Sequence, residues 1–269
     1  MYITTSWDDG HPLDLRVAEL LHKNGLPGTF YIPIQHRFPL LTHRQIRELV
    51  AAGFEIGGHT VNHCDLLTVS DVTARREIGE CKQELEQISG QPCAAFCFPK
   101  GHFRRHHVRA VAEAGFRSAR TVELMSVANP LTQDGVAMLA TTMQALDSRL
   151  PTFARNSVKR LQLGNLLRYI RFSKSDWVGT AAAVLRHVSE HGKVFHLWGH
   201  SWGIENRGQW ENVDTMFRIL GQCKREAIFV TNSELAEIAT RCMNGPFREL
   251  LKGSPNPLGD RVRSRRHFR

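Results

Sequence analysis

The sequence predicts an α/β protein in which parallel strands alternate with helices and close into one single-domain (β/α) barrel. Three observations lead to this fold class. Short β-prone runs alternate with amphipathic helical segments, and parallel strands need such crossover helices. The 269 residues, 42% of them hydrophobic, suffice for one large core, and barrels of roughly 200–250 residues commonly fold as one domain. Polar clusters also stand where several predicted strands end.

The strand–helix alternation can be followed along the chain. Seven runs are β-prone or apolar and are bounded by turn residues. They cover residues 2–6, 28–32, 54–57, 94–98, 116–121, 194–198 and 227–231. Helical spacing of apolar residues predicts the helices between them, two of which begin at a Ser or Thr N-cap. The helices cover residues 13–24, 42–52, 70–88, 108–115, 181–191, 213–223 and 233–242.

Two segments depart from this alternation. Residues 122–175 are predicted to be an insertion beside the barrel, with a basic amphipathic piece around 161–170. After Gly245 the composition turns to Pro, Gly and Arg, which predicts a disordered basic tail over residues 246–269. The barrel domain is therefore expected to span residues 1–245.

The net charge of +9 is concentrated at the C-terminus. Residues 252–269 hold six Lys or Arg and one Asp, and the remainder of the chain is close to neutral. We therefore expect no nucleic-acid partner and at most a weak contact of the tail with an anionic membrane surface.

No apolar run approaches the roughly 18 residues of a membrane span, and the first residues lack a signal-peptide pattern, so a cytoplasmic location is expected. The oligomeric state cannot be inferred from the sequence.

Two polar motifs at strand ends indicate metal chemistry. Asp8 and Asp9 are adjacent carboxylates that repel each other, so either a cation or a raised pKa must compensate; a turn with a helix N-cap is the alternative. His59 and His63 are four residues apart, which puts both imidazoles on one side of a tight turn. Two imidazoles and one carboxylate hold a catalytic divalent metal with open positions. Alone, the Asp8-Asp9 pair favours the turn and N-cap, and the two histidines are equally consistent with polar loop residues, whereas together the motifs favour the metal.

The motifs resemble those of the polysaccharide deacetylase family, the NodB-homology carbohydrate esterases. Residues 5–10, Thr-Ser-Trp-Asp-Asp-Gly, are similar to the first motif of that family, T-F-D-D-G. Residues 59–63 match its second motif, H-[ST]-x-x-H. Residues 98–101, Phe-Pro-Lys-Gly, resemble the third, R-x-P-x-G, with Cys97 at the arginine position.

The later motifs are looser. Asp176 and Trp177 resemble the end of the fourth motif, D-x-x-D-W, and the apolar strand that runs into His200 stands where the fifth belongs. The resemblance spans residues 2–240 and implies a distorted seven-stranded NodB-type barrel.

The resemblance also implies a role for each matched residue. Asp9, His59 and His63 would hold one divalent metal, with zinc expected first and Co, Ni or Mn as alternatives. Asp8 would act as general base on a water molecule, and His200 would protonate the leaving amine.

The remaining matched residues would assist this reaction. The turn of Pro99, Lys100 and Gly101 would supply the Lys100 backbone N–H as an oxyanion donor. Asp176 would orient or charge-stabilise the catalytic histidine. Because cysteine cannot brace a catalytic aspartate as the motif arginine does, either another cation replaces it, with Lys100, Arg104 and Arg105 near in sequence, or Asp8 has a different pKa from that of the family.

Three tryptophans are candidate sugar-binding residues. Trp177, Trp198 and Trp202 stand next to the motifs, and aromatic faces commonly line sugar sites. Packing in the core is the alternative for such bulky side chains.

Two histidines compete for the role of general acid. His196 lies within the apolar strand at 194–198, where a buried, hydrogen-bonded side chain is the expected outcome. His200 follows at the carboxyl end, where the catalytic residues of barrels gather. The sequence therefore favours His200.

The expected function is a metal-dependent hydrolase that removes the N-acetyl group from an amino sugar in a polysaccharide or glycoconjugate precursor. A cytoplasmic location would favour a nucleotide-linked or lipid-linked sugar over a cell-wall polymer. A related C–N hydrolase acting on a non-sugar amide, and a catalytically silent carbohydrate-binding module on the same scaffold, are the two alternatives.

Overall fold

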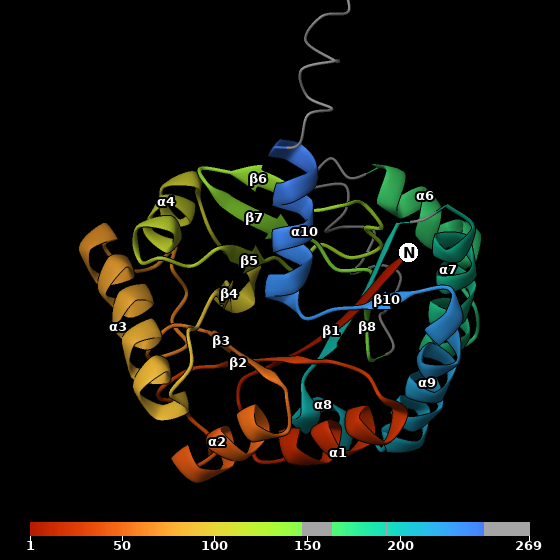
Figure 1. Cartoon of the computed structure of the whole chain (residues 1–269), viewed down its shortest axis with the longest axis horizontal. Coiled ribbons are helices and arrows are strands. Elements are labelled where there is room, and N and C mark those ends of the chain that lie inside the picture. The colour runs from red at the N-terminus through yellow and green to blue at the C-terminus, as the bar shows by residue number, and fades with distance from the viewer. Residues whose placement is uncertain (147–162, 192, 245–269) are drawn as a thin grey trace, which may run out of the picture.

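The computed structural model describes residues 1–146, 163–191 and 193–244, and these form a curled, mostly parallel sheet surrounded by helices (Figure 1). The hydrogen-bonded strand order is β6-β7-β5-β4-β3-β2-β1-β9-β8, and β10 pairs with β1. Every neighbouring pair is parallel except β6 with β7. The strands are β1 Tyr2–Asp8, β2 Thr29–Ile32, β3 Glu55–Gly58, β4 Ala95–Cys97, β5 Ser118–Arg120, β6 Leu131–Gln133, β7 Val136–Leu139, β8 Met143–Gln144, β9 Val194–Gly199 and β10 Ile228–Phe229.

Helices cover the outside of this sheet. Neighbouring helices pack against each other around the rim in the order α6, α7, α9, α1, α2, α3, α4 (Figure 1). Their bounds are α1 Asp14–Asn24, α2 His43–Ala51, α3 Asp71–Ser89, α4 Arg105–Glu113, α6 Leu163–Phe172, α7 Trp177–His191, α8 Ser201–Asn206, α9 Trp210–Gln222 and α10 Asn232–Asn244, with short 3-10 turns at Pro99–Gly101 and Cys223–Arg225. None of the described helices is long and apolar enough to cross a membrane.

The predicted fold class is confirmed. All seven expected strands are present, because each is an apolar run closed by turn residues, and they correspond to β1, β2, β3, β4, β5, β9 and β10. Helix boundaries also follow the expected caps: the Thr42 hydroxyl accepts from the Gln45 amide at the start of α2, and Gly25 adopts a left-handed φ of 62° after α1.

The segment predicted as an insertion differs from expectation. Strands β6, β7 and β8 lie within residues 131–144, and all three extend the sheet: β7 pairs with β5, β6 pairs with β7, and β8 pairs with β9. These strands are only two to four residues long, so their apolar pattern is too short to be recognised from the sequence. Residues 147–162 of the expected insertion and the whole expected tail, 246–269, lie outside the described residues.

The barrel is open between its two edge strands. Within the described residues no pairing joins β6 to β8, and α10 packs against β1, β5 and β7 (Figure 1). Apolar side chains of α10, β7 and β9 share one core cluster that includes Leu139, Val194 and Leu235. The helix thereby excludes water from an end of the barrel where strand pairing is absent.

Candidate active site

One cavity lies at the carboxyl ends of the central strands, and most of the sequence-predicted site residues line it. Its volume is about 640 Å³. The lining residues are Asp8, Asp9, His36, Arg37, Phe38, His59, Asn62, His63, Phe98, Lys100, Val122, Leu124, Gln144, Trp198, His200 and Trp202. The loops after β1, β2, β3, β4 and β9 all contribute, as expected where parallel strands end at one edge of a barrel.

Backbone strain is concentrated around this cavity. Asp9, Thr60, His63 and Lys100 adopt φ values of 80°, 65°, 47° and 59°, in the left-handed region that non-glycine residues rarely occupy. Residues held in such conformations cluster at functional sites, where the surrounding structure fixes them. The three loops that carry the predicted metal ligands and the oxyanion turn are therefore held in defined shapes.

Asp9, His59 and His63 form a set that fits a divalent metal. The Asp9 Oδ1 atom is buried without a hydrogen-bond partner among the described residues, and it lies 3.2 Å from His63 Nε2 and 3.6 Å from His59 Nε2. Ligand atoms bound at about 2.0–2.1 Å to one metal lie roughly 2.9–3.4 Å apart, close to these distances. His59 Nδ1 donates to the Cys97 carbonyl oxygen at 2.8 Å, which leaves the Nε2 lone pair facing Asp9.

The electrostatics of Asp9 agree with a cation site. Burial on its own raises the pKa of the Asp9 carboxyl, but the imidazoles of His59 and His63 more than offset it and hold the pKa well below its usual range. The carboxylate therefore stays ionised. Trp202 Nε1 donates to its other oxygen, Oδ2, at 2.9 Å, which fixes the carboxylate plane.

Asp8 is paired with an arginine that the sequence analysis missed. Arg120, fully buried at the end of β5, donates from its guanidinium to Asp8 Oδ2. Cys97 is the residue that pairs with Arg120 across β4 and β5, and its Sγ lies 3.9 Å from the same oxygen. Burial raises the pKa of the Cys97 thiol, so it stays neutral beside Asp8. Among the described residues, the cation that contacts Asp8 is thus Arg120, and not Lys100, Arg104 or Arg105.

The structure distinguishes the two histidines that competed as general acid. His200 lies between Trp198 and Trp202, with Nε2 at 3.9 Å from Asp8 Oδ2 and 3.7 Å from Asp9 Oδ2. Burial lowers the pKa of His200, and the two aspartates oppose this effect.

His196 lies outside the cavity, in the core. Its Nδ1 donates to the Ala140 carbonyl oxygen at 3.1 Å and its Nε2 lies 2.9 Å from the Ser6 hydroxyl. Burial lowers the pKa of His196 to about 3, so the ring stays neutral. His200 therefore lines the cavity, and His196 does not.

The third motif forms a tight turn at the cavity edge. Lys100 lines the cavity, whereas Pro99 and Gly101 are buried in the turn. Gly101 has a φ of 65°, and a Cβ at this position would collide with Val122. A glycine is therefore required for the close approach of this turn to the following segment.

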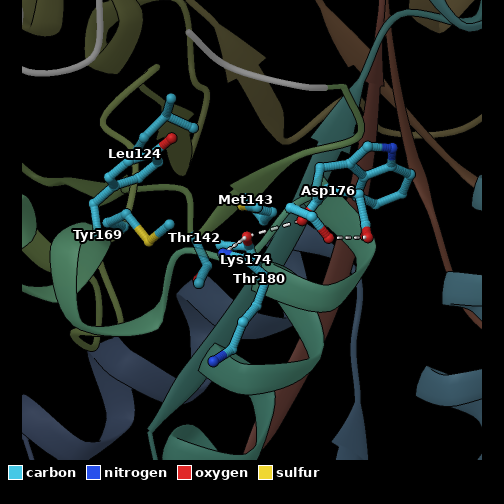
Figure 2. A pocket seen from close by; sticks show the side chains of 10 residues that line it. Leu124, Thr142, Met143, Tyr169, Lys174, Asp176 and Thr180 are labelled. Atoms are coloured by element: carbon cyan, nitrogen blue, oxygen red, sulfur yellow. Dashed lines mark hydrogen bonds between the residues drawn. The ribbon is translucent and has the colours of Figure 1, made fainter. Parts of the chain in front are cut away.

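Asp176 and Trp177 lie at a different place from the other predicted site residues. They line a separate, smaller pocket together with Leu124, Tyr169 and Thr180 (Figure 2). The Asp176 Oδ1 atom accepts from the Gly179 amide at 2.7 Å, which is the N-cap interaction of α7. Trp177 is buried and donates from Nε1 to Gln209. In this geometry Asp176 caps a helix and is not in contact with His200.

His36 also lines the cavity, and the sequence analysis missed it. Its ring lies 4.8 Å from the His63 ring and 3.8 Å from the Phe38 ring, centroid to centroid. A ligand atom of His36 falls within 4.8 Å of ligand atoms of Asp9 and His63. The Phe38 amide donates to His36 Nδ1 at 3.4 Å. The sequence signal that could have indicated His36 as a site residue is its place in the polar run 35–37, shortly after the predicted strand at 28–32.

Comparison with known proteins agrees with the motifs and the fold. A family model described as polysaccharide deacetylase matches residues 1–119. A curated Bacillus subtilis (strain 168) protein, YxkH, named as a polysaccharide deacetylase, is 23% identical over 125 residues. That match covers 45% of this chain and 44% of the relative, so it spans less than half of each.

Solved structures share this fold over most of the chain at low sequence identity. A structure from Mycobacterium smegmatis, described as a polysaccharide deacetylase, superposes with a TM-score of 0.66 at 16% identity and covers 91% of this chain and 92% of its own. BA3943 of Bacillus anthracis, described as a pseudoenzyme of carbohydrate esterase family 4, has a TM-score of 0.53 at 17% identity and covers 87% of this chain and 65% of its own.

The fold is a curled (β/α) barrel of the NodB type. Residues 1–119 match the polysaccharide deacetylase family model, in agreement with the resemblance that the motifs indicated.

Proposed function

We propose that this chain is a metal-dependent deacetylase that hydrolyses the N-acetyl amide of an amino sugar. The observation that carries the proposal is the convergence of Asp8, Asp9, His59, His63 and His200 on one cavity, with Arg120 neutralising Asp8. A module that only binds sugars has no need of a buried base beside a metal site. The Bacillus anthracis pseudoenzyme has the same fold, so the fold alone does not carry the activity.

The residues of the cavity divide the reaction between them. Asp9, His59 and His63 would hold the divalent metal, which would polarise the amide carbonyl and lower the pKa of a water molecule. Asp8, oriented by Arg120, would take the proton from the attacking water. His200, on the cavity wall between Trp198 and Trp202, would give a proton to the departing amine.

Two further features support an amide of a sugar as substrate. Lys100 lines the cavity edge, and its backbone N–H would stabilise a developing oxyanion there, whereas the Gly101 and His102 amides donate within the turn. Phe38 and Trp202 line the cavity, where a sugar ring can pack against them, whereas Trp198 is buried with the Arg120 guanidinium over its ring.

Metal analysis combined with acetate release tests the proposal. The purified protein should hold one equivalent of divalent metal and should release acetate from N-acetylated amino sugars. His200→Ala should keep the metal and lose about 10²–10⁴ in turnover. Asp9→Ala should lose metal and turnover together.

Three outcomes would contradict the proposal in different ways. Full metal retention in Asp9→Ala would refute the ligand assignment. Hydrolysis of simple amides but not of sugars would favour a C–N hydrolase with a non-sugar substrate. Tight sugar binding without any acetate release would favour a silent binding module.

A further inference from the structure

The charged side chains that line the cavity are unevenly compensated. They are two aspartates, Asp8 and Asp9, and two cations, Arg37 and Lys100. Asp8 has its own ion pair with buried Arg120, and Asp9 faces two imidazoles and the proposed metal. The two cations therefore have no carboxylate inside the cavity that is free to pair with them.

Arg37 is an exposed cation on the loop after β2. Its guanidinium lies 5.3 Å from the centre of the Phe38 ring, and it forms no ion pair with a carboxylate among the described residues. The Phe38 ring in turn contacts Trp202 at 5.7 Å between centroids. The guanidinium is thus held beside the aromatic wall and keeps its hydrogen-bond donors for a ligand.

Lys100 lies on the turn after β4, with weak local pairing. Its Nζ is 3.8 Å from Asp65 Oδ2, an oxygen that His102 Nδ1 approaches more closely, at 2.8 Å. The Lys100 side chain is 55% exposed, and Asp65 is not a lining residue of the cavity. The ammonium group can therefore leave this contact for a ligand at modest cost.

The strand order puts these cations on both sides of the metal-binding loop. The sheet runs β4-β3-β2, and the loop after β3 carries His59 and His63. Arg37 and Lys100 follow the two strands that flank β3. The nearby carboxylate of Glu77 accepts hydrogen bonds from the backbone and side-chain amides of Asn62. Glu77 does not line the cavity, so its carboxylate does not face the two cations.

We infer that the cavity takes an N-acylated amino sugar that carries a phosphate or diphosphate, bound between Arg37 and Lys100. Arginine recognises phosphate oxygens with two parallel hydrogen bonds and lysine recognises them as a point charge. The cavity, at about 640 Å³, is in the usual range for a ligand of this size. Nucleotide-linked and lipid-linked sugars share this chemistry. The inference rests on the proposed function and names its substrate class.

Kinetics on matched substrates test the inference. N-acetylglucosamine 1-phosphate and UDP-N-acetylglucosamine are compared with the uncharged methyl glycoside of N-acetylglucosamine. Arg37→Gln should raise KM about tenfold for the phosphorylated substrates and leave KM for the methyl glycoside unchanged, whereas Lys100→Gln should raise KM for the phosphorylated substrates by a larger factor than KM for the methyl glycoside. Raising salt from about 50 to about 500 mM should raise the same KM values.

A control variant separates local binding from overall charge. Arg44→Gln removes a cation of α2 whose side chain is 84% exposed and lies outside the cavity, and it should change no KM value. Equal KM values for charged and uncharged substrates, or unchanged KM in Arg37→Gln and Lys100→Gln, would overturn the inference.

Binding without turnover keeps the inference distinct from the proposed function. Calorimetric titration of wild-type protein with UDP-N-acetylglucosamine should show binding that Arg37→Gln weakens about tenfold, even where no acetate is released. Failure of acetate release with such binding would contradict the proposed function alone.

A comparison of two substrates distinguishes the source of the phosphate. A preference for UDP-N-acetylglucosamine over N-acetylglucosaminyl diphosphoryl farnesol in micelles would assign the nucleotide source, and the reverse preference would assign the lipid source.

Discussion

Replacing Arg120 by alanine should destabilise the protein, because it leaves Asp8 as a buried charge without its partner. Arg120 is 0% exposed and Asp8 is 3% exposed. Removing one partner of a buried ion pair costs roughly 3–5 kcal/mol. In a domain of this size each kcal/mol corresponds to about 2–4 °C in Tm. We therefore expect a loss on the order of 10 °C in Tm, together with a large loss of turnover.

The register of β4 and β5 offers a rescue. Cys97 and Arg120 are paired residues, so their Cα atoms lie about 4.8 Å apart and their side chains leave the same face of the sheet. Both side chains already contact Asp8 Oδ2. The double variant Cys97→Arg/Arg120→Cys exchanges the two side chains and should rebuild the ion pair from β4. It should recover at least half of the lost Tm.

Thermal unfolding, metal content and acetate release are measured on the single and the double variants. The matched control is Arg117→Ala, an exposed arginine just before β5 that pairs with Glu237 and should change stability by at most about 1 kcal/mol. Guanidinium added to Arg120→Ala should restore part of its turnover, which a purely structural defect would not allow. A double variant no more stable or active than Arg120→Ala, or wild-type turnover in Arg120→Ala, would refute the reasoning.

Three further changes have defined outcomes. Chelation of the metal should lower Tm in wild type and leave His59→Gln unaffected, because that variant has lost the site; equal shifts in both would argue against His59 as a ligand. Asp176→Ala should lose about 1 kcal/mol of stability through the α7 N-cap and keep its turnover, whereas a tenfold loss of turnover in folded protein would restore Asp176 to the reaction. His196, with a pKa lowered from 6.5 to about 3, binds a proton more readily when unfolded, so its contribution to stability is lost as the pH falls from about 6.5 towards 3. Urea unfolding across this range should show His196→Gln with a shallower acid loss than wild type by up to ~1.4 kcal/mol per pH unit, and parallel curves would contradict the assignment.

Much of the fold and the core of the site could be predicted, because the signals are local. Each of the seven expected strands is a short apolar run bounded by turn residues. The proposed ligands His59 and His63 lie in one loop, and Asp8 and Asp9 are adjacent, so the sequence displays both motifs directly. The cavity collects them because the carboxyl ends of parallel strands meet at one edge.

The missed features depend on contacts between distant segments. β6, β7 and β8 are too short for a period-two pattern, and pairing with β5 and β9 fixes them in the sheet. Asp176 matched a motif by its neighbour, Trp177, yet its carboxylate caps α7. A match at two neighbouring residues of a motif does not determine the direction of the Asp176 side chain.

Arg120 shows what the sequence contained but could not assign. It follows small and apolar residues in a predicted central strand, and a charge buried in such a strand must have a partner. Its presence therefore predicts a buried carboxylate nearby, while the choice of Asp8 requires the strand order β5-β4 and the register that pairs Arg120 with Cys97. A motif describes positions in space around a reacting group. Where a motif residue is missing, the residue paired with it on the neighbouring strand is the next place from which the same group can be supplied.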